Sequence, residues 1–252
     1  MELGLKNKRV LVVGASKGIG RATALAFASE NCHVVAVARS AELLTSLKEE
    51  GERKGAASFS YEVADIMECD PKAFAEELIS KYGEFEIVIQ NVGGSLVSRN
   101  HLADSTDWSY ALRFNALASI DMNSVFLPRM IEKGWGRVIH ISSASAQTLR
   151  GNPLYASSKA FLNAYVTTVG RQLASKGVLL TSVMPGAVAF EGSYWDNFTV
   201  TDPKRCEDYL SHHQAIGRFG TCEEIADVVL FMASEKSSFM PAACVAVDGA
   251  SM

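Results

Sequence analysis

The chain alternates short runs of β-branched and aliphatic residues with longer stretches in which apolar residues recur every three or four positions. The short runs end at glycine or polar residues, which is typical of strands buried on both faces of a parallel sheet. The longer stretches have the period of an amphipathic helix. We therefore expect strands at 9–13, 33–38, 58–64, 85–89, 137–141, 178–183 and 243–247.

Helical patterns separate these strands, from the end of the glycine turn at 20 to 28, and at 42–55, 71–82, 102–133, 155–173 and 223–233. Regular alternation predicts an α/β fold with one doubly wound parallel sheet of about seven strands and helices on both faces. No repeat or linker interrupts the pattern, so we expect a single domain over 1–252. The segment 187–220 has no clear strand and carries scattered aromatic residues, and we interpret it as a substrate-covering lid.

Composition narrows the class of protein. The 252 residues are 48% hydrophobic and 21% charged, as in ordinary globular proteins. A net charge of −4 argues against a nucleic-acid partner or an anionic membrane surface. The five scattered cysteines indicate neither a disulfide framework nor a metal site. No apolar run approaches the roughly 20 residues that span a bilayer, and the start lacks a signal-peptide pattern, so we expect a cytoplasmic protein.

Residues 14–20 form a glycine-rich turn between the first strand and the first helix. Strand, glycine turn and helix together aim backbone N–H groups and a positive helix end at a bound phosphate. The spacing is G-x-x-x-G-x-G and not the commoner G-x-G-x-x-G. Such turns also serve close packing alone, but in this setting the sequence favours a dinucleotide site.

The end of the second strand indicates which dinucleotide fits. In doubly wound folds an acidic residue there holds the ribose 2′-hydroxyl of NAD. Ala38 and Arg39 stand there instead, and Lys17 lies in the glycine turn. Two cations without a carboxylate suit a 2′-phosphate, so we expect NADP(H) in preference to NAD(H), although both could be solvated surface charges. Asp65, after the third strand, would accept from the adenine amino group or cap the next turn.

Tyr155 and Lys159 are four residues apart in a predicted helix and therefore share one face. A free tyrosine has a pKa of about 10, and a nearby cation favours the phenolate. The pair thus suits proton transfer to or from a hydroxyl or carbonyl oxygen. Taken alone, the pattern is weak evidence, because it is more often a surface pair on a packed helix.

Other landmarks follow in a fixed order: Asn91-Val92-Gly93-Gly94 after the fourth strand, Asn115 in a helix, Ser142-Ser143 after the fifth strand, Pro185-Gly186 after the sixth, and Asp248-Gly249 near the end. With the glycine turn, Asp65 and Tyr155-x-x-x-Lys159, they make the chain resemble the classical short-chain dehydrogenase/reductase family over essentially its whole length.

The resemblance implies a Rossmann fold and four catalytic residues. Tyr155 would be the acid/base, and Lys159 would lower the pKa of Tyr155 and bond the nicotinamide ribose. Ser143 would hold the substrate oxygen, and Asn115 would hold a water that relays protons. The cofactor-binding positions it implies are Gly14, Ser16, Lys17, Gly18, Ile19, Gly20, Arg39, Ser40, Asp65, Ile66, Asn91, Val92, Gly93, Tyr155, Lys159, Pro185, Gly186 and Val188.

The match to the family leaves the catalytic serine and the nicotinamide contact to be decided. Matching the strand end selects Ser143 as the catalytic serine, whereas counting back from Tyr155 by the family's commonest interval selects Ser142, and we favour Ser143. Phe190 stands where many members of the family carry a threonine that bonds the nicotinamide amide. The amide anchor and the lid are therefore expected to differ here.

We expect an NADP(H)-dependent oxidoreductase that interconverts a carbonyl and an alcohol, working as a reductase. It is similar to 3-oxoacyl-carrier-protein reductases and related carbonyl reductases. Its partners would be a small carbonyl or alcohol substrate and further copies of itself, as a dimer or tetramer. The alternatives are an NAD(P)-dependent sugar or polyol dehydrogenase, and an NADP-binding scaffold or sensor without turnover.

Overall fold

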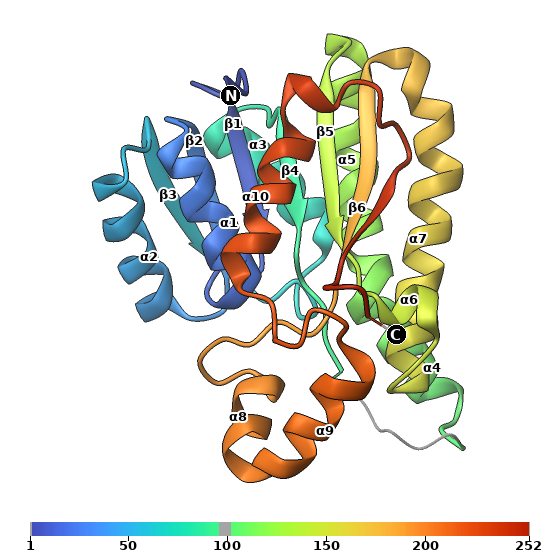
Figure 1. Ribbon diagram of the computed structural model, residues 1–252. Helices are drawn as coiled ribbons and strands as arrows, with labels where there is room; N and C mark the ends of the chain where they lie inside the picture. Colours follow the sequence, from blue (N-terminus) through green and yellow to red (C-terminus); the bar gives the residue numbers. More distant parts are fainter. Residues whose placement is uncertain (1, 96–101, 252) are drawn as a thin grey trace.

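The computed structural model describes residues 2–95 and 102–251 (Figure 1). The strands are β1 (Arg9–Val13), β2 (His33–Ala38), β3 (Ser58–Val63), β4 (Ile87–Gln90), β5 (Gly136–Ile141), β6 (Val178–Pro185) and β7 (Cys244–Val247). The α-helices are α1 (Gly18–Ser29), α2 (Ala41–Arg53), α3 (Pro71–Tyr82), α4 (Ser105–Leu112), α5 (Ala118–Lys133), α6 (Ser145–Thr148), α7 (Pro153–Leu173), α8 (Tyr194–Thr201), α9 (Pro203–His213) and α10 (Cys222–Ala233).

All seven strands pair in parallel in the order β3-β2-β1-β4-β5-β6-β7. The chain runs outward in one direction from β1 and in the other from β4, so these two neighbours form the switch point of the sheet. Dinucleotides bind at such a point, beyond the carboxyl ends of the strands. The expected doubly wound α/β fold is confirmed.

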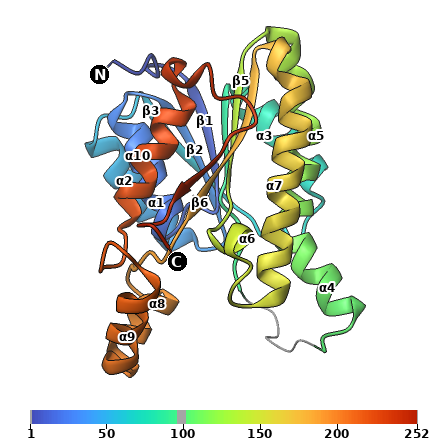
Figure 2. The same ribbon diagram turned by 45° about the vertical axis from the view of Figure 1, so that its right-hand side comes forward.

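Helices α1, α2 and α10 cover one face of the sheet, and α3, α5 and α7 cover the other (Figure 2). Alternate β1 residues serve the two cores, since Val10 and Val12 pack under α1 while Leu11 and Val13 face the opposite layer. The β-branched runs of the sequence therefore lie in strands that are buried on both sides.

The sequence placed one long helix over 102–133, but a π-helical turn, Arg113–Leu117, divides α4 from α5. Likewise, 187–220 is more ordered than a loop, because α8 and α9 lie within it. These helices project beyond the carboxyl ends of the strands (Figures 1 and 2). Asp202 caps α9 and Ser193 caps α8. These two polar residues were not used in predicting the segment from sequence, and they are the signal that could have indicated both helices.

Candidate functional site

The glycine turn closes against the end of β4. The Asn91 amide donates to the carbonyl of Gly14 at 2.8 Å and so joins the turn after β1 to the segment after β4. A Cβ on Gly20 would lie 2.1 Å from that carbonyl oxygen and 2.5 Å from Asn91 Nδ2. Only glycine allows α1 to start so close to the turn, which leaves the backbone N–H groups of its first turn directed at this end of the sheet. These residues fit a dinucleotide diphosphate.

The predicted 2′-phosphate residues lie beside the turn. Lys17 is exposed at the N-cap of α1 without a capping hydrogen bond. Arg39 is also exposed and pairs with Asp65 at 3.5 Å, an ion pair that solvent screens. Asp65 in turn accepts from the backbone N–H of Met67, which is the turn-capping alternative. Ser40 caps α2 by accepting from Leu43 N.

Tyr155 lies in the first turn of α7, and that turn is tightly held. The side chain of Asn152 accepts from the backbone N–H groups of Leu154 and Tyr155, and Pro153 occupies the first helical position. The Asn152 amide also donates to Ser95 Oγ at 3.0 Å, which ties the helix start to the segment after β4. Tyr155 is thus fixed at the carboxyl end of the sheet.

The Ser143 side chain lowers the pKa of the Tyr155 phenol, and its Oγ accepts from the backbone N–H of Ser145 at 3.1 Å. Ser142 instead donates to the backbone carbonyl of Lys159, at 3.5 Å. The two serines therefore differ in their surroundings, and it is Ser143 whose side chain acts on the phenol. This geometry favours Ser143 as the residue that contacts a substrate oxygen.

Lys159 is buried, with 2% of its surface exposed, and its ammonium donates to the carbonyl of Ile141 at 2.8 Å. The ammonium nitrogen lies 5.9 Å from the centre of the Tyr155 ring. Burial lowers the pKa of Lys159 from 10.5 to about 7, because a charged ammonium loses its water there.

The expected effect of Lys159 on Tyr155 is not found in this structure. Burial raises the pKa of Tyr155 above 10, and the Ser143 side chain only partly opposes that rise. Desolvation acts on both groups and disfavours the phenolate and the ammonium alike. The sequence could place the pair on one face but could not show how deeply that face is buried.

Asn115 lies in the π-helical turn and hydrogen-bonds to the glycine segment after β4. Its Nδ2 donates to the carbonyls of Ala111 (3.0 Å) and Gly94 (3.2 Å), while its Oδ1 accepts from Gly94 N at 2.9 Å. A Cβ on Gly93 would lie 2.8 Å from Asn115 Oδ1 and 2.8 Å from Lys159 Nζ. Asn115 Oδ1 and Lys159 Nζ are therefore separated by no more than twice 2.8 Å, a spacing that suits a bridging water.

The other predicted cofactor residues surround the same end of the sheet. Ile66 belongs to the core beneath it, and Val92 packs on Gly14. Val188 bridges to Gly220 and so fixes the segment after β6. Ser16 and Ile19 lie in the turn and the first turn of α1, and Pro185 and Gly186 close β6.

Sequence reasoning missed a buried polar network beneath Lys159. Asn123 accepts from Gln90 Nε2 at 3.2 Å and donates to His140 Nε2 at 2.8 Å and to the Tyr165 hydroxyl at 3.4 Å. His140 is fully buried, and burial, followed by the charge of Lys159, lowers its pKa to about 3, so it is neutral. The signal was Gln90 and His140, polar residues in apolar strands, which are partners in the sheet register.

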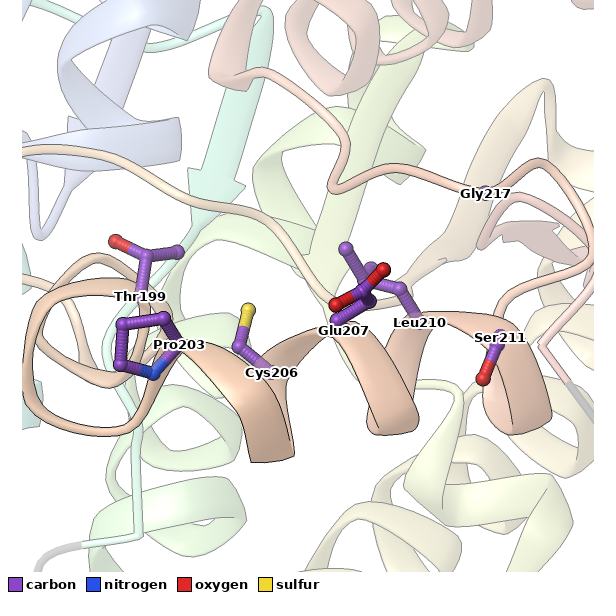
Figure 3. A pocket seen from close by; sticks show the side chains of 7 residues that line it. All are labelled: Thr199, Pro203, Cys206, Glu207, Leu210, Ser211 and Gly217. Carbon is purple, nitrogen blue, oxygen red and sulfur yellow. The ribbon is translucent and has the colours of Figure 1, made fainter.

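Two surface hollows lie on the described part of the molecule, and the second includes two of the predicted cofactor residues. A shallow pocket of about 390 Å³ lies along α9, where Cys206, Leu210 and Pro203 face Gly217 (Figure 3). A second, of about 360 Å³, includes Gly186, Val188 and Asp248. Within residues 2–95 and 102–251, no group of three potential metal ligands comes together. In the same ranges, no helix is long and apolar enough to cross a membrane.

Comparison with known proteins establishes the class. The sequence pattern of the short chain dehydrogenase family matches residues 8–193. The chain belongs to this family of NAD(P)-dependent oxidoreductases that act on CH–OH groups. The family resemblance of the sequence is thereby confirmed.

Particular relatives cover nearly the whole chain. The 3-oxoacyl-[acyl-carrier-protein] reductase of Thermotoga maritima is 30% identical, over 97% of this chain and 98% of its own. The L-sorbose reductase of Gluconobacter frateurii, solved with NADPH and L-sorbose, has a TM-score of 0.88 at 25% identity, over 99% of this chain and 98% of its own. A 3-oxoacyl (acyl-carrier-protein) reductase of Agrobacterium tumefaciens, solved with NADP bound, has a TM-score of 0.90 at 25% identity, over 97% and 94%.

Proposed function

We propose that the protein is an NADP(H)-dependent reductase of a ketone or aldehyde. The observation that carries the proposal is the buried Lys159 ammonium, which lies 5.9 Å from the centre of the Tyr155 ring on the same helix. A Cβ on Gly93 would lie 2.8 Å from that ammonium, and Asn91 of the same segment hydrogen-bonds to Gly14 of the glycine turn. A protein that only bound a nucleotide would have no need of this set, so the geometry speaks against a scaffold or sensor.

The residues divide the work as follows. The bound dinucleotide supplies the hydride. Tyr155 donates its hydroxyl proton to the carbonyl oxygen as that oxygen gains charge, and Ser143 donates a hydrogen bond to the same oxygen. Lys159, with a pKa of about 7, can return a proton to Tyr155 at neutral pH. Asn115 holds the Gly93–Gly94 segment and a water that connects Lys159 to solvent.

Charge at the end of β2 supports NADP(H). Arg39 and Lys17 are exposed, and no acidic residue ends β2. The Arg39–Asp65 pair is long at 3.5 Å, and a 2′-phosphate would compete for the guanidinium. The solved relatives with NADPH and NADP support the same choice.

For the substrate, the relatives support two classes. The Thermotoga relative acts on a 3-oxoacyl thioester by name, whereas the Gluconobacter relative was solved with a ketose. We favour a 3-oxoacyl thioester, and a sugar or polyol is the alternative. The lid formed by α8 and α9 presents the rings of Tyr194, Trp195 and Phe198, which pack on one another and would cover an apolar substrate.

Titration of the protein with NADPH and with NADH, followed by turnover of a 3-oxoacyl thioester and a ketohexose, tests the proposal. We expect NADPH to bind at least tenfold more tightly, equivalent to about 1.4 kcal/mol. The Arg39→Asp variant should reverse that preference, because a carboxylate repels a 2′-phosphate and accepts from a 2′-hydroxyl. Equal cofactor preference in both proteins would contradict the NADP(H) assignment, and binding without any turnover would favour the scaffold.

A further inference from the structure

The ring of Phe190 lies on the glycine turn. A Cβ on Gly18 would be 2.6, 2.8 and 2.9 Å from Cζ, Cε1 and Cε2 of Phe190. Contacts this short mean that the tip of the ring touches the Gly18 backbone and fills the space on its side-chain side. The three atoms nearest to that Cβ position all belong to Phe190.

That space is the one a dinucleotide needs. Glycine in the middle of such a turn leaves room for a diphosphate to approach the backbone. Helix α1 begins at Gly18, so its free N–H groups and the positive end of its dipole attract phosphate to the same place. An apolar ring and a diphosphate cannot both occupy it.

Phe190 is also tied to the lid. Its backbone N–H donates to Ser193 Oγ at 3.1 Å, and Ser193 N donates back to the Phe190 carbonyl at 2.8 Å. Ser193 is the N-cap of α8 and accepts from Asp196 N at 3.1 Å. When displacement of the ring moves this turn, the start of α8 moves with it. Tyr194 and Trp195 are the first residues of α8.

We propose that Phe190 plugs the diphosphate site, and that the ring must leave Gly18 before a dinucleotide binds. Its departure shifts α8, so cofactor entry and lid position are coupled. The inference rests on the proposed dinucleotide binding and adds a gate to it. The apparent affinity for cofactor is then reduced by the fraction of molecules in which the ring is seated.

Stopped-flow measurement of NADPH binding, by energy transfer from tryptophan, tests the plug. In the wild type the observed rate should level off at high NADPH concentration, because departure of the ring becomes limiting. In Phe190→Ala the rate should rise linearly, and the dissociation constant should fall about tenfold, as expected when nine molecules in ten are plugged. Phe190→Thr should behave like Phe190→Ala.

Phe239→Ala is the matched control. The Phe239 side chain is exposed, so the same change of residue type leaves the space at Gly18 filled and the lid intact. We expect its NADPH kinetics to follow the wild type. Lid movement is read from Trp195 in a Trp108→Phe, Trp135→Phe background, where Phe190→Ala should change the emission before any NADPH is added.

The outcomes separate the two proposals. If the wild type binds NADPH and Phe190→Ala binds it no more tightly, or more weakly, Phe190 is a wall of the site and the plug is wrong. If only the variant binds, the plug is supported in its strongest form. If neither protein binds NADPH or NADH, the proposed function and the plug both fall. Thermal unfolding of each variant verifies that it is folded.

Discussion

Burial of Lys159 determines much of the chemistry available at this site. A lysine with a pKa of about 7 exchanges its proton near neutral pH, which a surface lysine does not. Tyr155 is shifted in the opposite sense, toward the neutral phenol. A neutral phenol is well suited to giving a proton to a carbonyl when a neighbouring lysine can return that proton.

Lys159 makes stability depend on pH. Between about pH 7 and 10.5 the unfolded chain binds more protons at this lysine than the folded chain, so its contribution to the free energy of unfolding rises with pH across that window. Below about pH 7 the cost of burying the charge is present in full. We expect Lys159→Met to flatten the rise seen in urea titrations of the wild type. An unchanged slope would mean that Lys159 titrates normally.

The two adjacent serines offer a matched pair. Ser143→Ala removes the hydroxyl that lowers the pKa of Tyr155 and should lower kcat about 100-fold, the loss typical of one missing transition-state donor. Ser142→Ala removes only a 3.5 Å bond to the Lys159 carbonyl and should cost less than about tenfold. Steady-state kinetics of both variants decide the assignment, and the reverse ranking would select Ser142.

At the scale of elements, polar contacts hold α5, α7, β4 and β5 in place beneath the site. The network centred on Asn123 is fully inside the protein, where each unpaired group is costly. It orders the end of β5, whose last carbonyl receives the Lys159 ammonium. The network thus acts on the site through the strand and makes no contact with a substrate.

The Asn123 network can be tested by a double-mutant cycle. Asn123→Leu leaves His140 and Gln90 without their partner and should lower the free energy of unfolding by about 2–3 kcal/mol. The double variant with His140→Leu should cost clearly less than the sum of the two single changes, since neither member of the Asn123–His140 pair then leaves the other unpaired. Urea unfolding measures each step. Strictly additive losses would show that the two residues are not coupled.

At the scale of the whole molecule, the period of the apolar residues was sufficient to predict the sheet and most of its helices. What it could not predict depends on tertiary contacts. Asn115 looked like a mid-helix residue, and only its bonds to Gly94 show why the helix widens there. The plugging position of Phe190 joins residues far apart in the chain, which no local pattern encodes. Tyr155 and Lys159 lie on one helix as the spacing predicted, but the burial that shifts both pKa values depends on packing by distant segments.

We also propose a homo-oligomer that pairs through α5 and α7, as the family resemblance implies. The exposed positions of α7 include Phe161, Ala164 and Thr168. These uncharged side chains, spaced three and four residues apart, lie on one side of the helix, where a second copy could pack. Phe161→Glu should therefore convert the assembly to smaller species in light scattering. Val200→Glu, an exposed apolar position on α8, is the control and should leave the mass unchanged. A monomeric wild type would contradict the proposal.

Turnover and cofactor binding of Tyr155→Phe, measured side by side, test the central claim most directly. The change removes only the hydroxyl oxygen, so the ring keeps its place on α7 and the glycine turn is untouched. We predict that NADPH binds within about threefold of the wild type, while kcat falls at least about 1,000-fold, within the range of general acid catalysis. A variant that binds NADPH and keeps substantial turnover would show that Tyr155 is not the proton donor.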